Sequence, residues 1–141
     1  MLCPKEKRVK AITEVELYEI DDPAAPYRVV MWCLPPGPPE DVRLGERFPE
    51  GSITVPKSFG AIWFDVSTRQ GDWVAQATFA ADADAVRCDT ITVNAAHRRN
   101  GIATSLYETA SEMFQGPVIP ADIQTPDAKA FWGGRTQILH P

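Results

Sequence analysis

The first two thirds of the chain contain several short runs that are rich in β-branched and aromatic residues. In some of these runs the apolar residues alternate with polar ones. Such runs predict β-strands. The clearest pair is a hairpin, because Gly71 and Asp72 supply a turn between GAIWFDV (60–66) and WVAQATFA (73–80). Other strands are predicted at 9–20, with a charged outer face, at 27–34, which is more apolar, and at 88–93.

Proline interrupts this pattern in PPGPPEDVRLGERFPEG (35–51), the most irregular stretch of the chain. Proline lacks an amide donor and clashes with the preceding helical turn, so this stretch cannot sustain a long helix. We expect a loop there, or at most one short helix.

The period changes after Gly101, where apolar residues recur at helical spacing until Gly116 and Pro117 stop the run. A helix that packs one face on the sheet is therefore predicted. Its apolar positions are Ile102, Leu106, Ala110, Met113 and Phe114.

Two further elements are predicted near the C-terminus. The sequence VIPADI (118–123) indicates a last short strand. TPDAKAFW (125–132) opens a second helix, with Thr125 as the N-cap and Pro126 at the first helical position.

The length of 141 residues suits one domain, 1–141, with a single core. With 14 Lys and Arg against 19 Asp and Glu, the net charge is −5, so the overall field repels nucleic acid and anionic membrane surfaces. No extended phosphate-binding track is available, and nucleic acid is an unlikely class of partner.

The cysteines Cys3, Cys33 and Cys88 are odd in number and contain no CxxC pair, which indicates reduced thiols in a cytoplasmic protein. The two histidines, His97 and His140, indicate no metal cluster. The N-terminal stretch has no apolar signal region, and no segment is long and apolar enough to span a bilayer. We therefore expect neither secretion nor membrane insertion.

The stretch VNAAHRRNGIATSLY (93–107) joins the end of a predicted strand to the start of the predicted helix. A helix N-terminus presents unpaired N–H groups and the positive end of the helix dipole, and so favours an anion. Gly101 and Ala103 lack bulk and let the main chain approach a phosphate, while Arg98 and Arg99 add positive charge. The ligand indicated is a pyrophosphate.

The spacing is that of neither the GxxxxGK[ST] nor the GxGxxG phosphate-binding motif. RRNGIA, following ITV, instead resembles the [RQ]xxGx[GA] signature of the GNAT superfamily of acyltransferases, with Arg98, Gly101 and Ala103 at its defined positions. The resemblance covers about residues 73–135, because TPDAKAFW is similar to the family's C-terminal helix.

This resemblance implies an α/β (α+β) fold with a mixed, mostly antiparallel sheet flanked by helices on both sides. It also implies acetyl-coenzyme A, or another acyl-coenzyme A, as co-substrate. The pantetheine arm would pair with the strand at 91–93, and residues 98–104 would enclose the pyrophosphate. The cofactor-binding residues so implied are Ile91, Val93, Arg98, Arg99, Asn100, Gly101, Ile102, Ala103 and Thr104. The interval 35–51 departs from the family, which places one or two helices there.

Acyl transfer to an amine requires a neutral amine, and hence a base or a water path. A carboxylate on the strand before the motif is a common solution in the family. We assign that role to Asp89, which strand alternation places on the same face as Ile91 and Val93; Asp122 is the second candidate.

In many family members a tyrosine on the last helix protonates the leaving thiolate. The aromatic pair there is Phe131 and Trp132 in this chain, and both are predicted to close the core. Tyr107, one position after Leu106, is predicted to pack as well, and Cys88 to be a buried, inert thiol.

The predicted function is transfer of an acyl group from a coenzyme A thioester to an amine by direct attack. The acceptor is left open between a protein chain and a small molecule, and a homodimer is possible. Two alternatives remain. One is an acyl-coenzyme A-binding module that has lost its catalytic activity, which the missing tyrosine on the last helix favours. The other is a phage-type nucleic-acid-modifying enzyme of the same fold, which the net charge disfavours.

Overall fold

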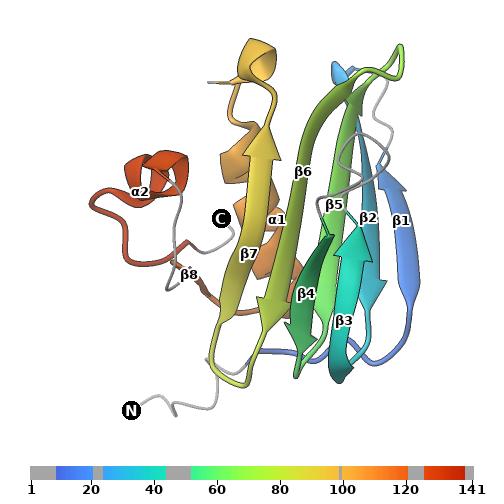
Figure 1. The fold of residues 1–141 in the computed structure, drawn as a ribbon, viewed down its shortest axis with the longest axis vertical. Helices are drawn as coiled ribbons and strands as arrows, with labels where there is room; N and C mark the ends of the chain where they lie inside the picture. Colours follow the sequence, from blue (N-terminus) through green and yellow to red (C-terminus); the bar gives the residue numbers. More distant parts are fainter. Residues whose placement is uncertain (1–8, 21–23, 44–51, 99, 121–125, 139–141) are drawn as a thin grey trace.

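The computed structural model describes residues 9–20, 24–43, 52–98, 100–120 and 126–138. These residues form two sheets, a short 3-10 turn and two helices (Figure 1). The larger sheet has six strands in the order β1-β2-β5-β6-β7-β8, all antiparallel except the β7–β8 pair. The bounds are β1 Glu16–Ile20, β2 Tyr27–Leu34, β5 Ala61–Thr68, β6 Trp73–Ala81, β7 Val86–Val93, β8 Val118–Ile119, α1 Ile102–Phe114 and α2 Pro126–Trp132.

Strands β5 and β6 form the predicted hairpin in the middle of the sheet. The turn closes because Gly71 adopts a φ of 91° and the Thr68 N–H donates to the Asp72 carbonyl at 2.8 Å. Strand β6 is buried along nearly its whole length, since α1 covers one of its faces and a smaller sheet covers the other.

The loop predicted at 35–51 is wrong for the first part of that interval. Residues Gly37–Arg43 form β3, which pairs antiparallel with β4 (Ser52–Lys57) in the smaller, two-stranded sheet. Pro38 and Pro39 lie where the register shifts, so their missing N–H groups cost no regular ladder bond. The remainder, 44–51, lies outside the described residues.

The smaller sheet rests on the larger one through its own apolar cluster. This cluster buries Val42 and Val55 against Ala61 and Ala80, with Leu34 and Trp63 packed around them. In the described part of the chain, the β5–β6 part of the face opposite α1 is therefore covered by strands (Figure 1).

The strand predicted at 9–20 forms only in its second half, as β1. In the first half Val9 and Ile12 are buried, and their N–H groups donate to carbonyls outside any sheet ladder, those of Ala83 (3.2 Å) and Phe59 (3.1 Å). This segment closes the core instead of extending the strand.

Helix α1 confirms the predicted amphipathic pattern and packs Ile102, Leu106, Tyr107, Ala110, Ser111 and Phe114 against the sheet. The helix ends where Gln115 adopts a left-handed conformation with φ 51°. Gly116 follows, and a Cβ at that position would lie 2.6 Å from Cγ2 of Val9. The close approach of the N-terminal segment therefore requires glycine there.

The C-terminal predictions are confirmed where the structure describes them. The short strand is present as Val118–Ile119, and the last helix as α2. Residues 121–123 and the predicted N-cap Thr125 lie outside the described residues. Neither α1 nor α2 has the length and apolar character that would let it span a bilayer.

The fold is mixed α+β and mostly β, with a six-stranded, mostly antiparallel sheet as predicted. The expectation of helices on both sides of the sheet is not met in the described residues. There α1 is the one long helix, and β3 and β4 cover the β5–β6 part of the second face.

Candidate functional site

Strand β7 has an open edge next to the start of α1. In the described part of the chain, β8 pairs with β7 only at two positions, Val86 with Val118 and Arg87 with Ile119. The chain segments then separate (Figure 1), so residues 88–93 of β7 have no described strand beside them on that side. Main-chain N–H and C=O groups at such an edge can pair with an extended ligand.

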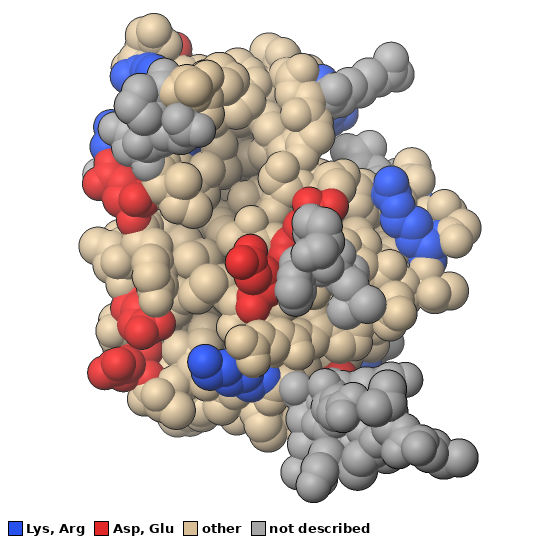
Figure 2. Space-filling view, turned by 180° about the vertical axis from the view of Figure 1, so that it is seen from behind, with Lys and Arg blue, Asp and Glu red and all other residues tan. Residues whose placement is uncertain are grey.

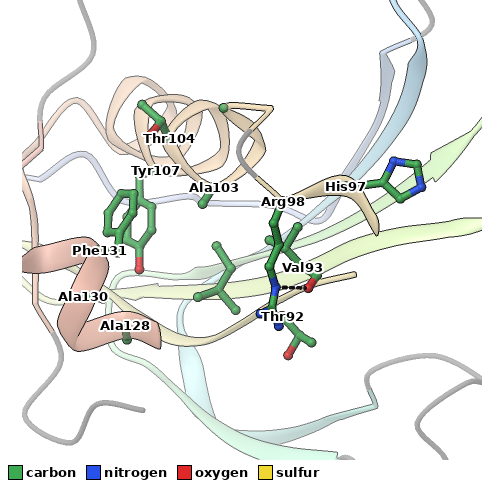
Figure 3. A pocket seen from close by; sticks show the side chains of 12 residues that line it. Thr92, Val93, His97, Arg98, Ala103, Thr104, Tyr107, Ala128, Ala130 and Phe131 are labelled. Carbon is green, nitrogen blue, oxygen red and sulfur yellow. Dashed lines mark hydrogen bonds between the residues drawn. The ribbon is translucent and has the colours of Figure 1, made fainter. Parts of the chain in front are cut away.

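The residues that face this open edge follow from the pairing of β7 with β6. The Asn94 N–H donates to the Val74 carbonyl at 2.7 Å, toward β6. Because successive residues of a strand direct their main-chain groups to alternate edges, those of Ile91 and Val93 point away from β6. The Val93 carbonyl agrees with this direction, since it accepts a hydrogen bond from Arg98 Nε at 3.2 Å (Figure 3).

Helix α1 begins beside the same edge. Gly101 precedes it with φ 74° and ψ 12°, and its carbonyl accepts the first helical hydrogen bond, from the Ser105 N–H at 3.0 Å. The N–H groups of Ile102, Ala103 and Thr104 therefore have no acceptor within the helix and favour an anion. A Cβ at Gly101 would meet nothing within 4 Å, so the position needs glycine for its positive φ and not for lack of space.

A cavity of about 620 Å³ lies between the open edge of β7, the first turns of α1 and one side of α2 (Figure 3). Cofactor and substrate pockets have volumes of roughly 300–1,000 Å³. The lining brings together residues from distant parts of the sequence: Ile91, Thr92, Val93, His97, Arg98, Gly101, Ala103, Thr104, Tyr107, Ala128, Ala130 and Phe131.

The loop between β7 and α1 is fixed by contacts to β2. The Tyr27 hydroxyl lies 3.2 Å from Nδ1 of His97 and accepts a hydrogen bond from Nδ2 of Asn100 at 3.2 Å. At the start of the loop, the side chain of Asn94 accepts from the Ala96 N–H at 3.1 Å and caps the 3-10 turn Ala95–His97. The loop is thereby held at both of its ends.

Asp89 lies at a bulge in β7. Thr78 of β6 pairs with Thr90 and Phe79 pairs with Cys88, which leaves Asp89 as an extra residue between the two pairs. Partial burial of the carboxyl removes some of its hydration and raises the pKa of Asp89 to about 6, although the residue as a whole is exposed. Such a pKa suits a proton acceptor near neutral pH.

The bulge also changes which side chains share a face. It shifts the alternation by one residue, so Ile91 and Val93 join Cys88 in packing against the core. The predicted shared face of Asp89 with Ile91 and Val93 therefore does not hold. Asp89 is not among the residues that line the cavity, and its side chain belongs to the opposite face of β7.

Tyr107 of α1 belongs to a chain of hydrogen bonds beside the cavity. The Trp132 indole, which can only donate, donates to the Tyr107 hydroxyl, and that hydroxyl donates to the Cys88 thiol. The thiol donates to the Thr90 carbonyl at 3.3 Å. Burial raises the pKa of Tyr107 well above its usual range and that of Cys88 to about 12, so both groups keep their protons at neutral pH.

Aromatic rings hold Tyr107 in place. Phe131 stacks on it, with centroids 4.7 Å apart and planes at 13°, while Phe79 and Trp132 each meet it edge-on at 5.2 Å. Trp132 and Tyr107 are buried in the core as predicted, and Phe131 packs against the core as a partly buried residue. Tyr107 and Phe131 also line the cavity. The sequence contained an indication that Tyr107 would lie at the cavity. Tyr107 follows Ala103 of the motif by four residues, and so lies on the same face of the helix.

The structure brings six of the predicted cofactor-binding residues to the cavity: Ile91, Val93, Arg98, Gly101, Ala103 and Thr104. Ile102 is buried in the core, and Asn100 holds Tyr27 without lining the cavity. Arg99 and the second candidate base, Asp122, lie outside the described residues. Within the described ranges, no three His, Cys, Asp or Glu side chains are grouped to hold a metal ion.

In comparisons with known proteins, no family model, no curated protein and no solved structure matches this chain. The function is accordingly inferred from the geometry and residues of the chain itself.

Proposed function

We propose that the cavity binds acetyl-coenzyme A, or a related acyl-coenzyme A, and that the protein transfers the acyl group to an amine. The observation that carries this proposal is the meeting of an open strand edge and a helix N-terminus in one cavity. A pantetheine arm contains amides that can pair with a strand edge, and its pyrophosphate suits the N–H groups that begin a helix. The resemblance of RRNGIA to the acyltransferase signature supports the same assignment.

Residues at different positions in the cavity would bind different parts of the ligand. The N–H groups of Ile102 to Thr104 and the Arg98 guanidinium would bind the pyrophosphate, and the main chain of Ile91 and Val93 would bind the arm. Apolar side chains at the α2 end, Phe131 among them, would exclude water from the acyl group. The coenzyme A thioester supplies an activated acyl group with a thiolate as leaving group.

Tyr107 and Asp89 would carry the proton transfers, one from each face of β7. Tyr107 approaches β7 from the α1 face and would donate a hydrogen bond to the departing sulfur in place of its bond to Cys88. Asp89 projects from the other face of the same strand and would accept the proton of the attacking amine. Alignment of the amine against the thioester would supply a further part of the rate.

Acetyl-coenzyme A is expected to raise the melting temperature. A ligand that binds only the folded state stabilises it by about 2.7 kcal/mol at a hundredfold excess over its dissociation constant. The measurement is a thermal melt with acetyl-coenzyme A, with pantetheine alone and ADP alone as the two half-ligands. Each half-ligand should give a smaller shift, because it reaches only the strand edge or only the helix N-terminus. An unchanged melt at millimolar acetyl-coenzyme A would refute the proposed function.

Amine-stimulated release of free thiol is expected to increase as the pH rises through about 6. Burial raises the pKa of Asp89 to that value, so its carboxyl is protonated and inactive as a base below it, and ionised and active above it. The acceptor should be an amine that is already neutral across this pH range, such as an arylamine. The pH dependence of the rate then contains no contribution from titration of the acceptor.

The matched variants are Asp89→Asn and Asp84→Asn, the latter at an exposed turn before the start of β7. Asp89→Asn should reduce turnover by about a hundredfold, remove the rise near pH 6 and leave the acetyl-coenzyme A melting shift intact. Asp84→Asn should change none of these. Parent-like turnover in Asp89→Asn would assign the base role to another group or to water.

A second candidate function is acyl-coenzyme A binding without transfer. It is favoured by Trp132, a buried residue without an acidic proton, at the position where the resembling family has its tyrosine. The melting shift without amine-stimulated thiol release would establish this second function. Nucleic-acid modification has less support, because the Lys and Arg of the described residues are scattered among acidic ones on the face that carries α1 (Figure 2).

A further inference from the structure

The edge strand β1 carries an unusual concentration of exposed apolar side chains. In the described part of the chain, the large hydrophobic residues with high exposure are Val15, Leu17, Tyr18, Ile20 and Trp32. Four of these five lie in or next to β1, and Trp32 is the cross-strand neighbour of Leu17. Apolar surface gathered at one place marks an interaction site more often than single exposed residues do.

Both faces of β1 contribute to this surface. Leu17, which is 60% exposed, lies on the face of Trp32, and Trp32 stacks on Trp63 with centroids 6.3 Å apart. Tyr18 and Ile20 lie on the other face. Since β1 ends the sheet and no described strand pairs with its outer edge, its main chain is open to a further strand.

The same edge is acidic. Glu14, Glu16 and Glu19 are interspersed with the apolar residues, and Figure 2 shows Asp and Glu side chains along the side of the molecule formed by β1. Arg28 forms an ion pair with Glu19, and Tyr18 donates a hydrogen bond to Glu16 at 3.0 Å. The edge therefore combines apolar contact area with negative charge.

We propose that β1 is a docking edge for an extended, basic segment of a partner protein, which adds to the sheet as a seventh strand. Main-chain hydrogen bonds along β1 would supply affinity. Selectivity would come from basic side chains beside Glu16 and Glu19 and from apolar ones packed on Leu17 and Tyr18.

Charge also argues against a second copy of this chain as the occupant. An antiparallel pairing of two β1 strands centred on Leu17 would place the two Glu16 side chains diagonally on one face. The register centred on Tyr18 would place the two Glu19 side chains diagonally on one face. Like charges at such positions destabilise a strand pair, whereas a basic strand removes this cost.

The test uses the full chain and a labelled peptide, Lys-Lys-Val-Val-Lys-Val-Lys. Paired antiparallel with β1, its Lys-Val-Val-Lys stretch places Lys opposite Glu16 and Glu19 and Val opposite Leu17 and Tyr18. Fluorescence anisotropy should show saturable binding of this peptide. The comparators are the same peptide with Glu in place of Lys, and the Lys peptide with its central Val replaced by Pro; both should bind at least tenfold more weakly. Hydrogen exchange should slow at those alternate amides of residues 16–20 that point to the outer edge when the Lys-Val peptide is bound, because the new strand accepts their hydrogen bonds.

Two double variants are compared, each of which reverses two negative charges. One pair of charges lies on β1 and the other lies away from it. Glu16→Lys with Glu19→Lys should weaken peptide binding by about tenfold. Glu108→Lys with Glu112→Lys, on α1, should leave it within about twofold. Equal loss in both double variants, binding without slower exchange in β1, or a dimer of the free chain that protects the β1 amides would each overturn the proposal. None of these results depends on acyl-coenzyme A binding.

Discussion

Replacing Gly101 with valine is expected to weaken acetyl-coenzyme A binding by about a hundredfold and so remove the melting shift at moderate ligand concentration. Gly101 adopts φ 74°, which costs a residue with a Cβ about 1–2 kcal/mol, and a β-branched residue more. The loop would relieve this strain by turning, and the N–H groups of Ile102 to Thr104 would then no longer face the cavity. A loss of about 2.7 kcal/mol corresponds to the hundredfold effect.

Gly71→Val is the matched control for this experiment. Gly71 also has a positive φ, 91°, and a Cβ there likewise meets nothing within 4 Å, but it lies in the β5–β6 turn and not at the cavity. Both variants should therefore lose similar stability, and only Gly101→Val should lose the acetyl-coenzyme A shift. An equal shift in the two variants would refute a binding role for the start of α1.

Tyr107→Phe is expected to reduce amine-stimulated thiol release by about a hundredfold while the acetyl-coenzyme A melting shift remains. The substitution keeps the ring that stacks on Phe131 but removes the hydroxyl, which burial keeps protonated by raising its pKa. It also leaves the Trp132 indole and the Cys88 thiol without their shared partner, at a cost of about 1–3 kcal/mol in stability.

Trp132→Phe separates the loss of chemistry from the loss of stability. This variant removes the other end of the same hydrogen-bond chain and part of a buried ring, so the free energy of unfolding should fall by at least as much as in Tyr107→Phe. It retains the hydroxyl, and thiol release should therefore stay within about tenfold of the parent. If both variants lose turnover equally, Tyr107 acts through the rigidity of the core and donates nothing to the sulfur.

The local sequence pattern was sufficient to predict those elements whose main-chain hydrogen bonds lie within the element or join it to the next element along the chain. The β5–β6 hairpin follows from its turn residues, and α1 follows from its apolar spacing. The RRNGIA stretch likewise pointed to the cavity, because a strand, a glycine and a helix start that are adjacent in sequence must be adjacent in space. Six of the residues assigned from it line that cavity.

Tertiary structure decided what depends on partners distant in sequence. The proline-rich Gly37–Arg43 becomes a strand because Ser52–Lys57 pairs with it and the larger sheet buries Val42, which outweighs its poor strand propensity. The extra residue at Asp89 depends on the register with β6, and a shift of one residue moves a side chain to the other face. Tyr107 acquires its polar partners only when α2 and β7 meet α1, because a periodic pattern specifies which face of a helix is buried and not which groups that face will meet.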